Sequence, residues 1–161
     1  MIYILTGDIR TGKTTALLDW VSGRNDADGL LCPDNENGRR YFLKVKSQKE
    51  IELEVEFESE EIITIGPFHF LKSAFKEANN YLLDANKRRD FRYLIVDELG
   101  KLELKNEGLH DAAKALIPNF IFNDNRHLIV VVRESLLHVI LKYYAISEYL
   151  VLKKEDLKEL D

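Results

Sequence analysis

A phosphate-binding pattern lies close to the start of the chain. It fits G-x-x-x-x-G-K-[ST] and consists of Gly7, Asp8, Ile9, Arg10, Thr11, Gly12, Lys13 and Thr14. Such a loop turns backbone N–H groups toward an anion, and the helix that follows adds its positive N-terminal end. The glycines permit close approach, Lys13 can reach the β and γ phosphates, and Thr14 can offer its hydroxyl to Mg²⁺. We therefore expect this loop to bind a nucleoside triphosphate, with Thr15 adding a contact to the α phosphate.

Two adjacent carboxylates follow an apolar run in the middle of the chain. The run Tyr93-Leu94-Ile95-Val96 ends in Asp97 and Glu98, which is typical of a buried parallel strand that delivers polar groups at its C-terminal end. We expect Asp97 to lie at the same sheet edge as the phosphate loop and to hold Mg²⁺ through water. Because side chains alternate along a strand, Glu98 should point differently, toward the γ phosphate, where it can orient or deprotonate a water molecule.

A guanidinium group near the γ phosphate would stabilise the charge on a transferring phosphoryl group. Arg133 follows the run 128–132 and is expected at the same edge, where a phosphate contact and a structural ion pair are both open. Arg10 lies inside the loop and is expected to be exposed, and Lys101 is a weaker candidate of the same kind. The clusters Arg39-Arg40 and Lys87-Arg88-Arg89 are interpreted as solvated charge.

Predicted strands alternate with predicted helices along the chain. Apolar runs predict strands at 2–6, 30–32, 62–65, 91–96, 128–132 and 149–152, and helical spacing predicts helices at 13–21, 71–83, 107–116 and 134–144. Two runs with period-two character, 40–45 and 51–57, predict an inserted antiparallel hairpin. This alternation indicates the α/β class, with a mainly parallel sheet covered by helices on both faces.

Length and composition indicate one globular domain over residues 1–161. The net charge of −5 disfavours a nucleic-acid partner, no apolar run is long enough to cross a bilayer, and no signal-peptide pattern is present. We expect a cytoplasmic protein, with a monomer favoured. Cys32 is expected to be a small buried residue. The four histidines lack the spacing typical of metal sites. Residues 153–161 are expected to form a solvated tail or frayed helix.

Several segments together resemble one known family. The most specific is Asp97-Glu98-Leu99-Gly100-Lys101-Leu102-Glu103-Leu104, which is similar to D-E-[IL]-G-[KP]-[LM]-E-L, and others are 7–15, 38–42, 65–70 and 132–136. By these segments the chain resembles the THEP1-type nucleoside-triphosphatases, which are small RecA-like P-loop proteins. Two features depart from the family: Arg10 stands where many members have glycine, and the last strand runs into Lys153-Lys154-Glu155 without the N-R-[DE] ending.

The resemblance implies Mg²⁺-dependent hydrolysis of nucleoside triphosphates to the diphosphate and phosphate, with broad base tolerance. The position of Glu98 directly after Asp97 also favours a hydrolase, since no obvious machinery for a second substrate is visible. Two alternatives remain open. Phosphate loops serve small-molecule and nucleotide kinases as well, and a nucleotide-dependent switch or adaptor with little turnover would keep Lys13 and Asp97 but tolerate the loss of Glu98.

Overall fold

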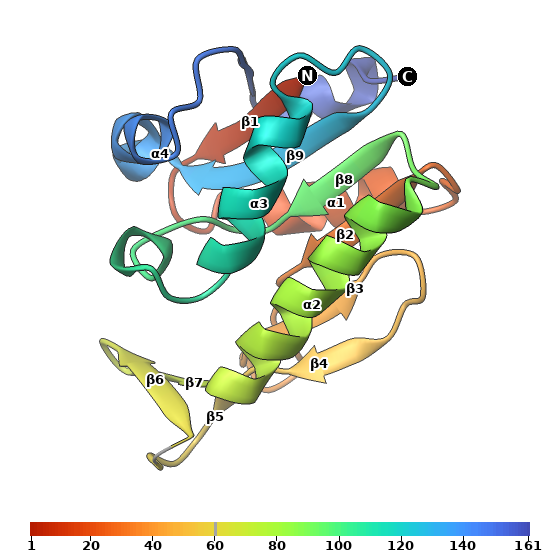
Figure 1. The fold of residues 1–161 in the computed structure, drawn as a ribbon. Helices are drawn as coiled ribbons and strands as arrows, with labels where there is room; N and C mark the ends of the chain where they lie inside the picture. Colours follow the sequence, from red (N-terminus) through yellow and green to blue (C-terminus); the bar gives the residue numbers. More distant parts are fainter. Residues whose placement is uncertain (60) are drawn as a thin grey trace.

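A seven-stranded sheet forms the centre of the computed structural model, which describes residues 1–59 and 61–161 (Figure 1). The strand order is β10-β1-β9-β8-β2-β3-β4, and the first five of these strands run parallel. The bounds are β1 Ile2–Gly7, β2 Ala27–Leu31, β3 Tyr41–Lys44, β4 Glu50–Glu52, β8 Tyr93–Val96, β9 His127–Arg133 and β10 Leu150–Leu152. The mainly parallel α/β sheet predicted from the sequence is therefore confirmed.

Helices cover both faces of this sheet, as predicted. They are α1 Lys13–Val21, α2 Lys72–Arg88, α3 His110–Phe120 and α4 Leu137–Tyr143, with short 3₁₀ helices η1 Glu103–Lys105, η2 Glu134–Leu136 and η3 Lys154–Glu159. The pleat of β1 explains the two layers, because Ile2 and Ile4 belong to the hydrophobic cluster under α2, α3 and α4, whereas Leu5 belongs to the cluster under α1. Within the described ranges, no helix is both long and apolar enough to cross a membrane.

The predicted hairpin is present, but it extends the main sheet. β3 pairs antiparallel with both β2 and β4, so the hairpin continues the sheet beyond β2. The run 51–57, expected as one strand, is divided at Leu53, after which β5 Glu54–Val55 leaves for a second sheet. Leu53 is buried. The chain therefore changes sheets at a residue that the core holds in place.

The second sheet is small and antiparallel, with the order β5-β7-β6. Its strand β6 Ile62–Ile65 was predicted, but β7 Phe68–Leu71 was not. Phe70 lies in the core, and Phe68 packs against it. Pairing with β5 and β6 thus makes this segment a strand, and α2 begins only at Lys72.

The charged C-terminal segment forms a short helix that is packed against the protein, which corrects the expectation of a solvated tail or frayed helix. η3 contacts α1 and β10, and Leu157 is buried in the cluster below α1. Lys154 Nζ donates a hydrogen bond to the carbonyl of Thr11 at 2.7 Å. Burial of Leu157 helps to hold this segment beside the phosphate loop, since burial of such a side chain contributes about 1.5–3 kcal/mol.

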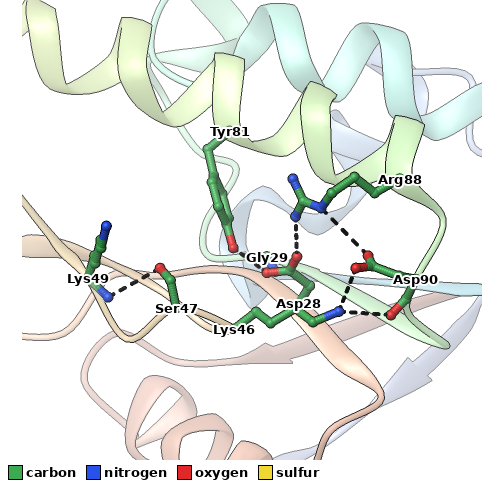
Figure 2. A network of polar contacts seen from close by, with 8 residues as sticks. All are labelled: Asp28, Gly29, Lys46, Ser47, Lys49, Tyr81, Arg88 and Asp90. Carbon is green, nitrogen blue, oxygen red and sulfur yellow. Dashed lines mark hydrogen bonds and ion pairs between the residues drawn. The ribbon is translucent and has the colours of Figure 1, made fainter.

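Arg88 forms an ion pair with a buried carboxylate, although its cluster was interpreted as solvated charge. The fully buried carboxylate of Asp28 on β2 accepts hydrogen bonds from Arg88 Nη2 at 2.7 Å, from the Tyr81 hydroxyl and from the Gly29 backbone N–H (Figure 2). Asp28 lies near the N-terminal end of β2, away from the edge that the phosphate loop occupies. Because a buried charge is costly without partners, this network fixes the C-terminal end of α2 to the sheet.

Candidate active site

The phosphate loop connects β1, which ends at Gly7, to α1, which begins at Lys13. Two positions in it need glycine. A Cβ atom on Gly7 would lie 2.9 Å from Thr11 Oγ1, and Gly12 has φ 85°, in the left-handed region. Gly12 also precedes α1 without a side-chain cap, so the first N–H groups of the helix are left for a ligand.

The buried side chain of Lys13 lies back across the loop. Its Nζ donates hydrogen bonds to the carbonyls of Gly7 and Asp8, at 3.2 and 2.7 Å. These carbonyls hold the ammonium over the interior of the loop, where an anion would bring it a stronger, charge-assisted hydrogen bond. The sequence pattern predicts that Lys13 binds phosphate, and the position of its Nζ is compatible with that role.

Thr14 and Asp97 meet although 83 residues separate them. Thr14 Oγ1 donates a hydrogen bond to Asp97 Oδ2 at 2.7 Å. The topology explains the contact, since β9 lies between β1 and β8, and the carboxyl ends of these parallel strands share one edge of the sheet. The backbone N–H of Cys32, at the end of the neighbouring β2, donates to the same oxygen at 3.1 Å. Cys32 itself is half-buried against the core, close to the buried position predicted for it.

Glu98 and Arg133 form an ion pair, with Arg133 Nε 3.5 Å from Glu98 Oε1. Arg133 ends β9 opposite Gly7 in the register, so it lies at the predicted edge. The sequence left a phosphate contact and a structural ion pair open for Arg133, and the structure shows the ion pair. β8 ends at Val96, so the pleat alternation does not extend to the two carboxylates, and both line the same pocket.

Most of the predicted site residues line one pocket of about 390 Å³, which we call the phosphate pocket. It is lined by residues 10–15 of the loop, Leu18, residues 32–34, Arg40, Asp97 and Glu98. Gly7, Asp8 and Ile9 belong to the loop but do not line this pocket. Arg133 lines a neighbouring cavity, together with its ion-pair partner Glu98. The side chain of Arg10 is exposed, as expected, and its backbone has φ 57°.

Three residues near the pocket were not predicted as part of it. Arg40 was interpreted as solvated, yet it is half-buried in the pocket wall. Lys154 contacts the loop from η3. The buried carboxylate of Glu103 accepts hydrogen bonds from the N–H groups of Gly100 and Leu109 and so braces the loop that follows Glu98. Arg40 and Glu103 both lie in segments that carried the family resemblance, which was the available signal for them.

Burial gives Asp97 a pH-dependent effect on stability. Its pKa is raised to about 7, first by burial and then by repulsion from Glu98. The unfolded chain ionises this group at its ordinary, lower pKa, so between the two values the folded state binds more protons and its stability falls as pH rises. We expect Asp97→Asn to lose less stability than the native chain between about pH 5 and pH 8, measured by urea unfolding without Mg²⁺ or nucleotide.

Part of the fall should remain in Asp97→Asn, because burial also raises the pKa of Glu103 to about 7. The exposed residue Asp111 provides a control, since Asp111→Asn should keep the native pH dependence. An equal fall in Asp97→Asn and the native chain would contradict the assigned effect of burial.

A family model described as NTPase matches residues 2–159 of the chain. The chain belongs to this NTPase family. The resemblance to THEP1-type proteins found in the sequence is thereby confirmed, and membership identifies the protein as a nucleoside-triphosphatase in the general sense of the family. None of the curated protein sequences matches it.

Among solved structures, this NTPase is similar to the crystal structure of THEP1 from the hyperthermophile Aquifex aeolicus. The TM-score is 0.78 at 20% sequence identity, and the match covers 100% of this chain and 97% of the other. At this level of identity the similarity establishes the fold, which is that of a P-loop NTPase.

Proposed function

We propose that this NTPase hydrolyses nucleoside triphosphates to the diphosphate and phosphate, depends on Mg²⁺ and tolerates different bases. The observation that carries the proposal is the 2.7 Å hydrogen bond between Thr14 and Asp97, beside Lys13 and Glu98 in one pocket. This reaction needs a hydroxyl and a carboxylate that bind the cation, an ammonium that binds phosphate, and a general base. Base tolerance is supported by the pocket lining, which is suited to the phosphates that all these nucleotides share.

The residues present fit a magnesium ion. Mg²⁺ prefers oxygen ligands and is usually held by one or two protein groups together with substrate phosphates and water. Thr14 and Asp97 supply such oxygens, and no cluster of three or more histidine, cysteine or carboxylate side chains suited to a metal occurs in the part of the chain that the structure describes. When bound, the ion would neutralise charge on the β and γ phosphates.

The chain's own groups divide the remaining work. Lys13 exchanges its carbonyl partners for phosphate oxygens, and the loop N–H groups orient the triphosphate. Glu98 accepts a hydrogen bond from the attacking water, orients it and takes its proton as the water oxygen bonds to the γ phosphorus. The bond between the γ phosphorus and the oxygen that bridges to the β phosphate breaks, and the diphosphate leaves with that oxygen. Arg133 holds the Glu98 carboxylate in place through their ion pair. It is therefore a positioning residue in this proposal.

Phosphate release from the native chain tests the proposal. We expect release from ATP, GTP, CTP and UTP at rates within about tenfold of one another, because the recognised phosphates are the same. Release should stop when EDTA removes Mg²⁺ and return when Mg²⁺ is added in excess. Strict dependence on an added hydroxyl-bearing acceptor would replace the hydrolase with a kinase. Nucleotide binding without release would indicate a switch or adaptor.

A further inference from the structure

A second cavity, of about 310 Å³, adjoins the phosphate pocket. We call it the aromatic cavity, because its lining includes Phe42, Phe68, Phe70 and Phe75. These rings come from β3, from β7 of the small sheet and from the first turn of α2. The lining also includes Gly100, Lys101 and Leu102, from the loop after β8. The proposed hydrolysis uses none of these groups.

The phenylalanine rings make an ordered lining. Phe70 lies edge to face with Phe75, at 6.2 Å between centroids and 88°, and Phe42 lies edge to face with Phe75, at 5.7 Å and 74°. Phe68 is parallel to Phe70 at 6.0 Å. Phe42, Phe70 and Phe75 are buried, and they support Phe68, which is partly exposed. The ring of Phe68 can stack or pack edge to face with a planar aromatic ligand, which favours such a ligand over an aliphatic one.

The charged side chains of the cavity wall favour a ligand of one charge. The acidic side chains there are already engaged, since Asp97 accepts from Thr14 and Cys32, Glu98 pairs with Arg133, and Glu103 accepts two backbone N–H groups. By contrast, Arg40 and Lys101 have no ion-pair partner among residues 1–59 and 61–161. The unused charge in the cavity is therefore positive.

Arg40 connects the two spaces. It lines both the phosphate pocket and the aromatic cavity, as do Cys32, Asp97 and Glu98. Its guanidinium carbon lies 5.8 Å from the ring centroid of Phe68, close enough for a cation–π contact. An anionic group bound at Arg40 would therefore lie beside an aromatic wall and next to the place expected for the terminal phosphate.

We propose that the aromatic cavity binds a second ligand beside the nucleotide, a small planar aromatic molecule with one anionic group. Its ring packs against Phe68, and its anionic group contacts Arg40. The volume is at the lower end of ligand pockets, about 300–1000 Å³, so it suits a single ring system better than a complete nucleotide. Binding of this ligand requires no phosphate chemistry. It can therefore be tested separately from the proposed hydrolysis.

Benzoate serves as the probe, titrated against the full chain and followed by ligand-observed NMR. We expect saturable binding at one site, and binding at least about tenfold weaker for benzamide, which lacks the charge, and for cyclohexanecarboxylate, which lacks the planar ring. Equal affinity for all three compounds, or no saturable binding of benzoate, would overturn the proposal.

Two matched pairs of variants locate the site. Arg40→Ala should weaken benzoate binding at least about tenfold, whereas Arg39→Ala should not, because Arg39 pairs with Glu56 and lies outside the cavity. Phe68→Ala should weaken binding and Phe57→Ala should not, since Phe57 is 75% exposed and does not line the cavity. Thermal unfolding checks that each variant is folded. If Arg40→Ala and Phe68→Ala are folded and bind benzoate as the native chain does, the assignment is wrong.

A competition experiment separates this ligand from the base of the nucleotide itself. Benzoate should bind with the same affinity in the presence of saturating ADP and Mg²⁺, since the two spaces are adjacent but distinct. Mutual exclusion would show that the cavity holds the nucleotide base and would overturn the proposal. If the chain releases no phosphate but still binds benzoate as described, the proposed hydrolysis fails and the second-ligand site stands.

Discussion

Glu98→Gln is expected to lower phosphate release about a hundredfold while nucleotide binding persists, because a positioned general base contributes about 10²–10⁴ in rate. Glutamine keeps the size of the side chain, but it cannot accept the proton of the attacking water. Glu98 lines the phosphate pocket and is held by Arg133. The effect should therefore appear in kcat and leave the affinity for ADP near that of the native chain.

Glu107→Gln is the matched control for this experiment, since Glu107 is an exposed carboxylate on the loop that follows Glu98. It should leave phosphate release unchanged. Native-like phosphate release by Glu98→Gln would show that Glu98 is not the general base. A change in ADP affinity without a change in kcat would show that Glu98 acts in nucleotide binding instead. Arg133→Ala should lower kcat less than Glu98→Gln does, because the carboxylate remains and loses only its orientation.

Lys13→Ala is expected to weaken binding of nucleoside triphosphates on the order of a hundredfold, since truncating one partner of a buried charge pair costs several kcal/mol. The ammonium is buried and its present partners are the uncharged carbonyls of Gly7 and Asp8, so phosphate is the natural counter-charge. Calorimetry with a non-hydrolysable triphosphate measures the loss. The loss of affinity should be larger for the triphosphate than for the monophosphate, because the monophosphate lacks the β and γ phosphates that Lys13 would contact.

Lys114→Ala provides the control for this experiment, because Lys114 is exposed on α3 and outside the phosphate pocket. Its affinity for the triphosphate should equal that of the native chain. Equal affinity in Lys13→Ala would contradict the role of the loop as a phosphate cradle. If Lys13→Ala binds the triphosphate normally but releases no phosphate, Lys13 acts only in the chemical step.

Local patterns were sufficient to predict most elements of the main sheet. The runs 93–96 and 128–132 are continuous and rich in β-branched or apolar residues, and they became β8 and β9, which are buried on both faces. α1 followed directly from the glycine pattern. The segment 68–71 was not predicted as a strand because four residues carry too little periodicity. Its pairing with β5 and β6 comes from residues elsewhere in the chain.

The same contrast applies to charged side chains. Arg39 and Arg40 are neighbours of one type, and nothing local distinguishes them, yet Arg39 pairs with Glu56 at the surface while Arg40 lies in the wall shared by two pockets. Arg88 is likewise distinguished from its neighbours by its ion pair with the buried carboxylate of Asp28 on β2 (Figure 2). The environment of a charge depends on which element packs against it.

The sequence by itself determined the phosphate loop, because its function requires glycine, lysine and threonine at fixed, adjacent positions. It also determined the carboxylate pair at 97 and 98, because a strand end is a local feature. Only the tertiary structure decided that Thr14 and Asp97 are in contact, that Arg133 holds Glu98, and that an aromatic cavity adjoins the pocket through Arg40. The physical reason is that these contacts depend on the strand order β1-β9-β8-β2-β3 and on the small sheet. Both arise from pairings between distant segments, which local spacing does not encode.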